Sequence, residues 1–375
     1  MYDFTTLTER RDSLSIKWKG VAEDEIPAFV ADSDFRSPPS SIEAMQACLD
    51  HGIFGYMADD VEGWNLQIDW WKRYHDLDFT REQACYCSGV VPAQVASILA
   101  VTKPGDAVVL QPPIYPPFIS AIRNNERTMV NNPLLRTDEG WRMDFDDLED
   151  KFRAGAKVFL LCSPHNPVGR VWTREELQTL ADLAARYDVR VISDEIHGDL
   201  EIYGHRHIAY ASIDRREDRV VTLIAATKTF NLQGLHQSTV ICKDPETLKT
   251  IRGLIARTGA GGPNIFGQAA QNGAYRGGRA WLEELKTVIE GNIDAVRPVL
   301  LEKGLWCAKP EGTYILWVDG SALGLKGQAL VDHIRKTTGV LVTNGADFGD
   351  DTFFRLILAT QPARAKSIAE RMKRL

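Results

Sequence analysis

The 375-residue chain has the composition of an ordinary globular protein, with 44% hydrophobic and 25% charged residues. Its net charge of −7 and the lack of a Lys/Arg-rich stripe argue against nucleic acid as the main partner. No run of about 18 apolar residues is present and the N-terminus is polar, so we expect neither a membrane partner nor a targeting segment.

Cysteine usage favours a reducing compartment. The six cysteines are scattered, and Cys85 and Cys87 form C-x-C rather than the C-x-x-C of a redox or zinc site. We therefore expect six reduced thiols in the core, no bound metal and a cytoplasmic location.

Short apolar runs alternate with helical patterns through the middle of the chain. Residues 85–100 predict a strand, a glycine turn and a helix. Four further strands are apolar on both faces, as buried parallel strands are; they lie at 107–113, 157–164, 189–195 and 219–228. An amphipathic helix is predicted at 173–188, where Thr173 and Glu176 form a capping box. The alternation predicts an α/β fold with a mainly parallel sheet flanked by helices.

The pattern changes after Arg279. A long helix with an internal proline is predicted first, followed by strands mixed with helices. The predicted elements are helix 279–304, strand 312–319, helix 327–339, strand 339–344, strand 353–360 and a C-terminal helix. We therefore predict a large domain over 41–278, a smaller α+β domain over 279–375, and an N-terminal segment, 1–40, that wraps onto both.

Polar side chains follow the ends of the four middle strands. Tyr115 and Asn166 follow the first two strands, Asp194 and His197 follow the third, and Lys228 is expected to end the fourth. Functional groups in open α/β sheets gather at the carboxyl ends of strands. We therefore expect a phenol, an amide, a carboxylate and an amine to lie close together.

These groups are the set that one cofactor, pyridoxal 5'-phosphate, requires. A lysine amine forms a Schiff base with an aldehyde, a carboxylate keeps a pyridine nitrogen protonated, and an aromatic ring stacks on the pyridine. An amide can bind the phenolic oxygen of that ring. The backbone N–H groups of the helix that follows Gly89 could bind the phosphate.

Eight stretches, in order along nearly the whole chain, carry a family resemblance. They are "PAFVADSDFRSPP" (27–39), "GIFGYM" (52–57), "SGVVPA" (88–93), "PPIYPPF" (112–118), "SPHNPVGRVWT" (163–173), "SDEIHGDL" (193–200), "TKTFNLQGL" (227–235) and "FGDDTFFRLILA" (348–359). The sequence resembles the fold type I pyridoxal-phosphate enzymes of the aminotransferase superfamily, and within them the cystathionine β-lyase / C–S lyase group.

The resemblance implies a role for each site residue. Lys228 would hold the cofactor covalently and later move the substrate's α-proton, while Asp194 would pair with the pyridine nitrogen. Asn166 and His197 would lie near the phenolic oxygen, and Tyr115 would stack on the ring. The phosphate would be bound by the backbone of Gly89, Val90 and Val91, by the Thr227 hydroxyl and by Tyr56 of the neighbouring subunit of a homodimer. The substrate carboxylate would be bound by Arg355 together with Asn166.

Some positions depart from the family pattern or have a simpler explanation. His236 stands where many aminotransferases have a phosphate-binding arginine, and Ile357 stands where the group often has asparagine. We expect the "GHRH" stretch at 204–207 to be a solvated loop rather than a metal site. The "GAGGPN" stretch at 259–264 fits either a phosphate loop of the partner subunit or a flexible turn before a helix.

The resemblance implies β-elimination from cystathionine or related S-substituted cysteines. Thiol, pyruvate and ammonia would be released, and cystathionine would give homocysteine, a step of methionine biosynthesis. The same cofactor chemistry also supports transamination, which stays an alternative. A regulatory protein that binds the cofactor without turnover is a further alternative, although Lys228, Asp194 and Arg355 argue against it.

Overall fold

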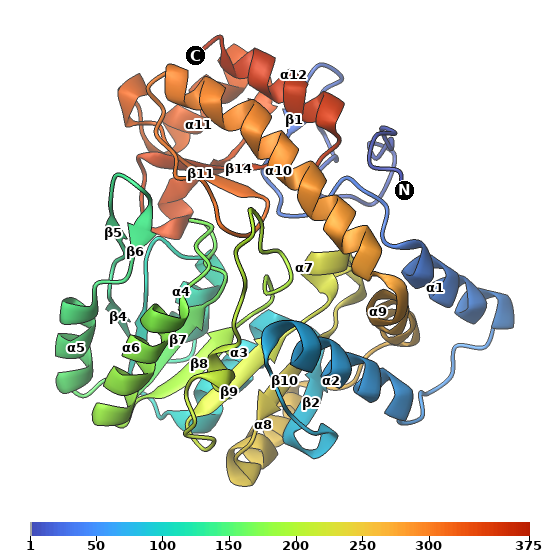
Figure 1. Ribbon diagram of the computed structural model, residues 1–375, viewed down its shortest axis with the longest axis vertical. Helices are drawn as coiled ribbons and strands as arrows, with labels where there is room; N and C mark the ends of the chain where they lie inside the picture. The colour runs from blue at the N-terminus through green and yellow to red at the C-terminus, as the bar shows by residue number, and fades with distance from the viewer. Residues whose placement is uncertain (1) are drawn as a thin grey trace.

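A computed structural model describes residues 2–375 (Figure 1). Its largest sheet has seven strands in the order β2-β10-β9-β8-β7-β3-β4. Strands β9, β8, β7, β3 and β4 are parallel, whereas β10 runs antiparallel to β9 and β2. The strands are β2 (Ala84–Cys87), β3 (Ala107–Leu110), β4 (Thr128–Asn131), β7 (Val158–Cys162), β8 (Arg190–Asp194), β9 (Val220–Ile224) and β10 (Ser238–Cys242).

Twelve helices surround this sheet and the smaller one described below, within residues 2–375. They are α1 (Pro39–His51), α2 (Val61–His75), α3 (Val90–Val101), α4 (Pro116–Arg123), α5 (Phe145–Arg153), α6 (Arg174–Arg186), α7 (Thr227–Phe230), α8 (Pro245–Thr258), α9 (Ile265–Gly277), α10 (Arg279–Glu302), α11 (Gly327–Thr338) and α12 (Pro362–Met372). Short 3₁₀ turns lie at Arg81–Gln83, Tyr210–Ser212, Gln233–Leu235, Ser321–Leu323 and Gly345–Phe348.

Every residue of β7 is buried because helices cover both faces of the sheet. Val158 and Leu160 pack in a cluster with apolar residues of α3, α4 and α8. Phe159 and Leu161 point to the opposite face and pack with residues of α5 and α6. Burial on both faces accounts for the continuous apolar runs from which the parallel strands were predicted.

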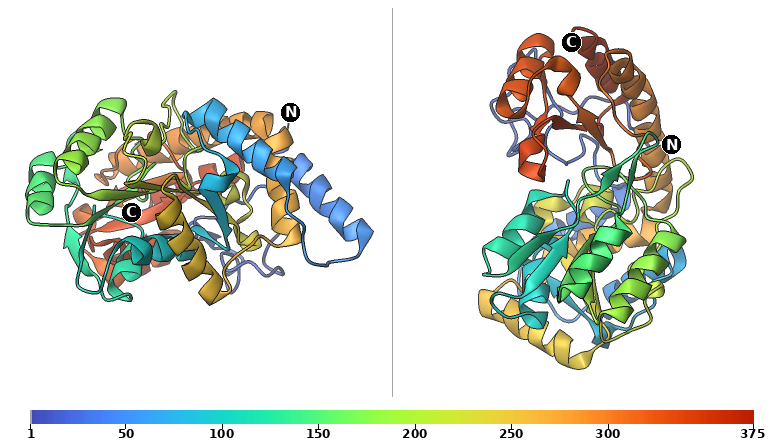
Figure 2. Two further views of the ribbon diagram at one scale, coloured as in Figure 1. Left: turned by 90° about the horizontal axis from the view of Figure 1, so that it is seen from below. Right: turned by 90° about the vertical axis from the view of Figure 1, so that its left-hand side faces the viewer.

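A second sheet belongs to the C-terminal part of the chain. Its order is β11-β14-β13, and β14 (Phe353–Ile357) runs antiparallel to β11 (Ile315–Asp319) and β13 (Thr343–Asn344). Figure 2 (right) shows these elements, in orange and red, as a separate group above the large sheet. The long helix α10 contains Pro298 inside its length and packs along α12.

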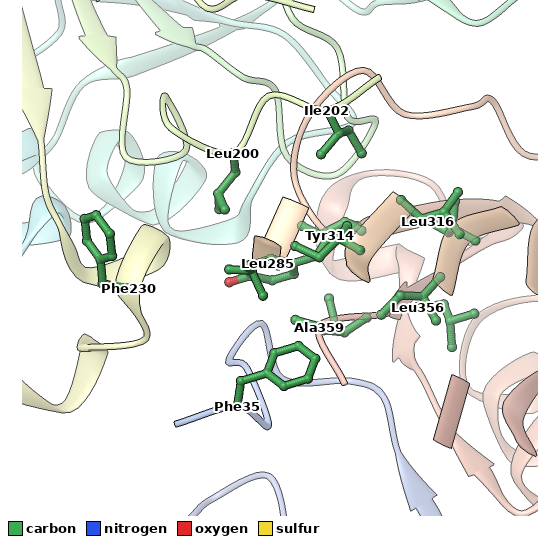
Figure 3. Close-up of a cluster of buried hydrophobic side chains, with 14 of the residues drawn as sticks. Phe35, Leu200, Ile202, Phe230, Leu285, Tyr314, Leu316, Leu356 and Ala359 are labelled. Atoms are coloured by element: carbon green, nitrogen blue, oxygen red, sulfur yellow. The ribbon is translucent and has the colours of Figure 1, made fainter. Parts of the chain in front are cut away.

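The N-terminal segment contacts both parts. Strand β1 (Ile26–Pro27) pairs in parallel with β12 (Val340–Leu341), and Asn231, directly after α7, donates hydrogen bonds to the carbonyls of Ser33 and Phe35. Phe35 belongs to the same apolar cluster as side chains of α7, α10 and the C-terminal sheet (Figure 3). The remaining strands, β5 (Leu135–Arg136) and β6 (Trp141–Arg142), form a small hairpin. The boundaries of the three predicted domains stay a prediction.

The predicted α/β architecture is confirmed, and two element assignments are wrong. Lys228 does not end a strand, because β9 stops pairing with β10 at Ile224 and the chain then turns into the short helix α7. The strand predicted at 339–344 is two strands, because β12 pairs with β1 whereas β13 pairs with β14.

Two expectations about single side chains also need correction. All six cysteines are free, but Cys48 and Cys85 are only half-buried and so lie at the edge of the core. In the 204–207 stretch His207 is buried rather than solvated, because its Nε2 lies 3.0 Å from the buried carboxylate of Glu195. The 259–264 stretch leads into α9, which Asn264 caps by accepting a hydrogen bond from the N–H of Gly267.

Candidate active site

A cavity of about 730 Å³ opens at the carboxyl ends of β7 and β8 and at the N-terminus of α3. Within residues 2–375, the structure brings every predicted site residue except Tyr56 to its wall. These residues are Gly89, Val90, Val91, Tyr115, Asn166, Asp194, His197, Thr227, Lys228 and Arg355. Thus predicted residues up to 266 positions apart in sequence, from Gly89 to Arg355, share one cavity.

Asp194 is the last residue of β8 and is almost fully buried. The one hydrogen bond to its side chain within the described chain comes from the backbone N–H of Ile196, at 3.1 Å from Oδ1. Burial raises the pKa of Asp194 to about 7, with a contribution from the charge of Glu195, while the charge of Lys228 acts in the opposite direction. A cation placed in the cavity beside this carboxyl group would restore its ionised form.

Lys228 lies on α7, and its Nζ donates a hydrogen bond to the carbonyl of Ala31 at 2.8 Å. Burial lowers the pKa of Lys228 to about 8, and the positive charge of Arg355 adds to this effect. The charges of Asp32 and Asp194 act in the opposite direction but do not restore the ordinary pKa. The amine is therefore much easier to deprotonate than that of a surface lysine.

Arg355 is a buried cation on β14 that forms no ion pair with a carboxylate of residues 2–375. Its Nη2 donates to the carbonyl of Phe29 at 3.0 Å, its Nη1 lies 3.4 Å from Oδ1 of Asn166, and its Nε has no partner among the described residues. Burial lowers the pKa of Arg355 to about 10. The guanidinium of Arg355 is therefore available to an anion in the cavity.

His197 is also buried at the cavity wall. Its Nδ1 has no hydrogen-bond partner among residues 2–375. Burial lowers the pKa of His197 to about 3, and the positive charges of Lys228 and Arg355 add to this shift. The imidazole is therefore neutral, so that it can donate or accept a hydrogen bond in the cavity without carrying charge.

The N-terminus of α3 forms one end of the cavity. Gly89 caps the helix with φ 157° and ψ 162°, a backbone conformation that is essentially restricted to glycine. The first N–H groups of a helix have no partners within the helix and attract anions. The backbone of Gly89, Val90 and Val91 and the hydroxyl of Thr227 all lie at the cavity wall, where a phosphate could bind.

Tyr56 is the predicted residue that lies outside this cavity. It is fully exposed in the connection between α1 and α2, near the exposed apolar side chains of Ile53 and Phe54. Conversely, Phe29, Val30 and Ala31 line the cavity but were not predicted to do so. Phe29 and Ala31 contribute backbone carbonyls, whose role cannot be predicted from a side-chain type. The one indication in the sequence is that these residues lie within the 27–39 stretch that carries the family resemblance.

The fold and this cavity agree with comparisons to known proteins. The sequence profile of the family described as Aminotransferase class I and II matches residues 39–372. The chain belongs to this family. The match spans both sheets and includes every cavity residue named above except Phe29, Val30 and Ala31.

Individual family members are similar over their full length. The chain is 38% identical to cystathionine beta-lyase PatB of Bacillus subtilis (strain 168), over 94% of each sequence. Cystalysin of Treponema denticola, whose structure contains pyridoxal 5'-phosphate, superposes with a TM-score of 0.95 at 32% identity, covering 100% of this chain and 98% of its own. A PLP-bound C–S lyase of Staphylococcus hominis gives a TM-score of 0.92 at 27% identity, with 100% and 98% covered. These comparisons confirm the resemblance noted in the sequence.

Two structural observations complete this description. Within residues 2–375, His, Cys, Asp and Glu side chains form no group of three or more placed to hold a metal ion. No helix in the same part of the chain combines the length and the apolar character needed to cross a membrane.

Proposed function

We propose that this protein is a pyridoxal 5'-phosphate-dependent carbon–sulfur β-lyase that acts on cystathionine or related S-substituted cysteines. One observation carries the proposal: the amine of Lys228 and the carboxyl group of Asp194 line the same cavity, with pKa values of about 8 and about 7. The names of the similar proteins, a cystathionine beta-lyase and two proteins crystallised with the cofactor, support it.

The residues present fit this cofactor. Among residues 2–375, no cationic side chain donates a hydrogen bond to Asp194, a role that a protonated pyridine nitrogen would fill, and no carboxylate pairs with Arg355. The N-terminus of α3 and Thr227 offer N–H and O–H donors to a phosphate. Tyr115 lies at the wall as an aromatic surface for the ring, and Asn166 and His197 offer polar groups to the phenolic oxygen. We assign the cofactor contacts to these residues.

Pyridoxal 5'-phosphate, when bound, supplies an electron sink for negative charge that develops at the substrate's Cα. Asp194 would sustain this function by holding the ring nitrogen protonated, because a buried ion pair favours both charged forms. Lys228 would hold the cofactor covalently in the resting enzyme. Once the substrate amine replaces it, the Lys228 amine would accept the proton from Cα, a task suited to a pKa of about 8.

Arg355 would orient the substrate by binding its α-carboxylate through two parallel hydrogen bonds. Phe29 and Asn166 each occupy one N–H of the guanidinium, so the Nε–H and the second N–H of each terminal nitrogen remain for this anion. Loss of the Cα proton and breakage of the Cβ–S bond would release a thiol. Water would then convert the remaining three-carbon fragment to pyruvate and ammonia.

We further propose that the enzyme is a homodimer and that Tyr56 reaches the phosphate of the partner's site. The supporting observation is that Tyr56 is fully exposed beside the exposed Ile53 and Phe54, on a segment that a partner would cover. We also propose a cytoplasmic location, which the six free cysteines support.

The experiment that tests the function is an absorption spectrum followed by a product assay. The purified protein should absorb visible light, and borohydride should bleach this colour by fixing the cofactor on Lys228. Cystathionine without any added keto acid should yield thiol, pyruvate and ammonia in equal amounts. A strict requirement for a keto acid would instead identify an aminotransferase, the activity for which the matching family is described. No spectral change with cystathionine, S-alkyl cysteines or keto acids would identify a non-catalytic binding protein.

A further inference from the structure

A buried polar network lies directly behind the cavity. Its centre is Asp199, which lies in the loop after β8, five residues beyond Asp194, and is 1% exposed. Its carboxylate accepts three side-chain hydrogen bonds, from Nε1 of Trp70 at 2.7 Å, from Nε2 of His75 at 2.7 Å and from Oγ1 of Thr229 at 2.9 Å. The network therefore joins α2, the loop after β8 and α7.

Thr229 connects this network to the catalytic candidate. It is the residue after Lys228 and is 1% exposed, so its hydroxyl reaches Asp199 without competition from solvent. Helix α7 has four residues, too few for its own backbone hydrogen bonds to fix its position. Its placement must therefore come from side-chain contacts such as this one and from the contacts of Asn231 with the N-terminal segment.

His75 holds Asp199 in its ionised form. Burial disfavours the charged form of His75, but the charge and hydrogen bond of Asp199, with the more distant Glu201 and Glu195, raise its pKa. The pKa of Asp199 is lowered in turn: burial opposes ionisation, but the charge of His75 and the three hydrogen bonds outweigh it. The aromatic ring of Trp71 and the imidazole of His207 pack against His75 at 4.6 Å and 5.3 Å between ring centres. The pair is thus enclosed, and the hydrogen bond that Thr229 donates to an ionised carboxylate is stronger than one to a neutral acceptor.

We propose that Asp199, held by His75, is a positioning residue that fixes Lys228 in the cavity through its hydrogen bond to Thr229. Asp199 is not among the described residues that line the cavity, and it acts on the amine through Thr229, the residue next to Lys228. The end of β8 would then place Asp194 at the ring nitrogen, and the loop after β8 would secure the amine through Asp199. This inference rests on the proposed function only in taking Lys228 as the reacting amine.

Thr229 and Thr222 provide a matched pair of substitutions. Both are buried at 1% exposure, but the hydroxyl of Thr222, on β9, has no hydrogen-bond partner among residues 2–375. Thr229→Val removes the bond to Asp199 while keeping the shape of the side chain. Thr222→Val makes the same chemical change without removing a side-chain bond, and Thr229→Ser restores the hydroxyl.

The variants should be compared as holoenzymes by kcat and KM for cystathionine and by titration of the cofactor's visible absorbance against pH. We expect Thr229→Val to lower kcat by about 10- to 100-fold with little change in KM, because a small displacement of a reacting group is enough for such a loss. The midpoint of the absorbance titration should shift by about half a pH unit or more, since the surroundings of the amine change. Thr229→Ser should recover most of kcat and the midpoint, and Thr222→Val should match the wild type in both.

Several outcomes would overturn the inference. Wild-type kcat and midpoint in Thr229→Val would show that the bond to Asp199 does not position the amine, and equal losses in Thr222→Val would show a packing effect only. If Thr229→Val does not accumulate as folded protein, Thr229→Ala carries the same test without steric demand. The failure of the proposed function has a different signature: borohydride would fix the cofactor on a residue other than Lys228, or on none, in the wild-type enzyme itself.

Discussion

Asp194 ends strand β8 and Asp199 lies five residues further on, in the loop that follows; both are buried, yet their surroundings shift their pKa values in opposite directions. Asp194 accepts one hydrogen bond and burial raises its pKa to about 7, whereas Asp199 accepts three and its pKa is lowered. The carboxyl group at the cavity thus has unused hydrogen-bonding capacity among the described residues, whereas the carboxylate of Asp199 has its hydrogen bonds filled. A buried carboxylate with too few hydrogen bonds is stabilised only when a cation binds beside it, so it suits a binding site. A buried carboxylate with satisfied hydrogen bonds instead stabilises the surrounding structure.

The largest effect that this comparison predicts comes from removing the amine. Lys228→Ala should lower lyase activity by at least about 10³-fold, because the variant loses both the covalent attachment and the proton acceptor. Pyruvate release from cystathionine measures this. Lys286→Ala is the control, since Lys286 is a buried lysine outside the cavity that pairs with Glu201 and Glu283. Retention of a tenth or more of wild-type activity in Lys228→Ala would remove that residue from the mechanism.

Asp199→Asn should disrupt the buried hydrogen-bond network around Asp199. Loss of the carboxylate leaves His75 without its ion-pair partner in a buried site, so the free energy of unfolding should fall by about 3–5 kcal/mol. Urea unfolding of holoenzyme and variant at pH 6 measures the difference; below its raised pKa, His75 is charged in the folded wild type. An unchanged midpoint and slope would mean that the network contributes nothing to stability.

In protein from which the cofactor has been removed, Asp194→Asn should raise the free energy of unfolding, whereas Asp199→Asn lowers it. The pKa of Asp194 is about 7 in the folded chain and about 3.9 in the unfolded chain, so the folded state holds the proton more tightly. Its contribution therefore makes the wild type lose stability as pH rises from about 4 to about 7. Asparagine cannot ionise, so at pH 8 the variant should be more stable than wild type by about 2–4 kcal/mol.

At pH 4 the Asp194→Asn variant and the wild type should unfold at nearly the same urea concentration, which provides an internal control. With the cofactor bound, the same substitution should instead lower lyase activity, because the ring nitrogen loses its counter-ion. Equal stability of the two proteins at pH 8 would contradict the account of Asp194 as an unsatisfied carboxyl group.

The smallest effect is expected at Arg355. Arg355→Lys keeps the charge but loses the two-pronged geometry, so KM for cystathionine should rise by about 10- to 100-fold while kcat changes less. Arg136→Lys is a suitable control, because Arg136 pairs with Asp319 and does not line the cavity. If both variants have the same KM, Arg355 does not bind the substrate carboxylate.

Residue types and strand ends predicted four of the polar side chains at the cavity wall. The side chains of Tyr115, Asn166, Asp194 and His197 follow buried parallel strands, and the carboxyl ends of such strands meet at one edge of a sheet, so their meeting could be foreseen. Arg355 was not predictable in this way, because it comes from the C-terminal sheet, and the family resemblance alone placed it.

Other features of the site depend on tertiary contacts that leave no periodic pattern. The carbonyls of Phe29 and Ala31 enter the site because the N-terminal segment is held by β12 and Asn231. The bond between Asp199 and Thr229 joins the loop after β8 to helix α7, between residues 30 positions apart in sequence. Lys228 lies in the short helix α7 instead of the expected strand, because the pairing of β9 with β10 ends four residues earlier, at Ile224.

The carbonyl oxygen of Ala31 accepts hydrogen bonds from two donors, Nζ of Lys228 at 2.8 Å and the hydroxyl of Tyr314 at 3.1 Å. Tyr314 directly precedes β11, so the second of these bonds ties the carbonyl of Ala31 to the C-terminal sheet. The carbonyl of Ala31 therefore keeps a donor from the C-terminal part of the chain even if the Lys228 amine moves away.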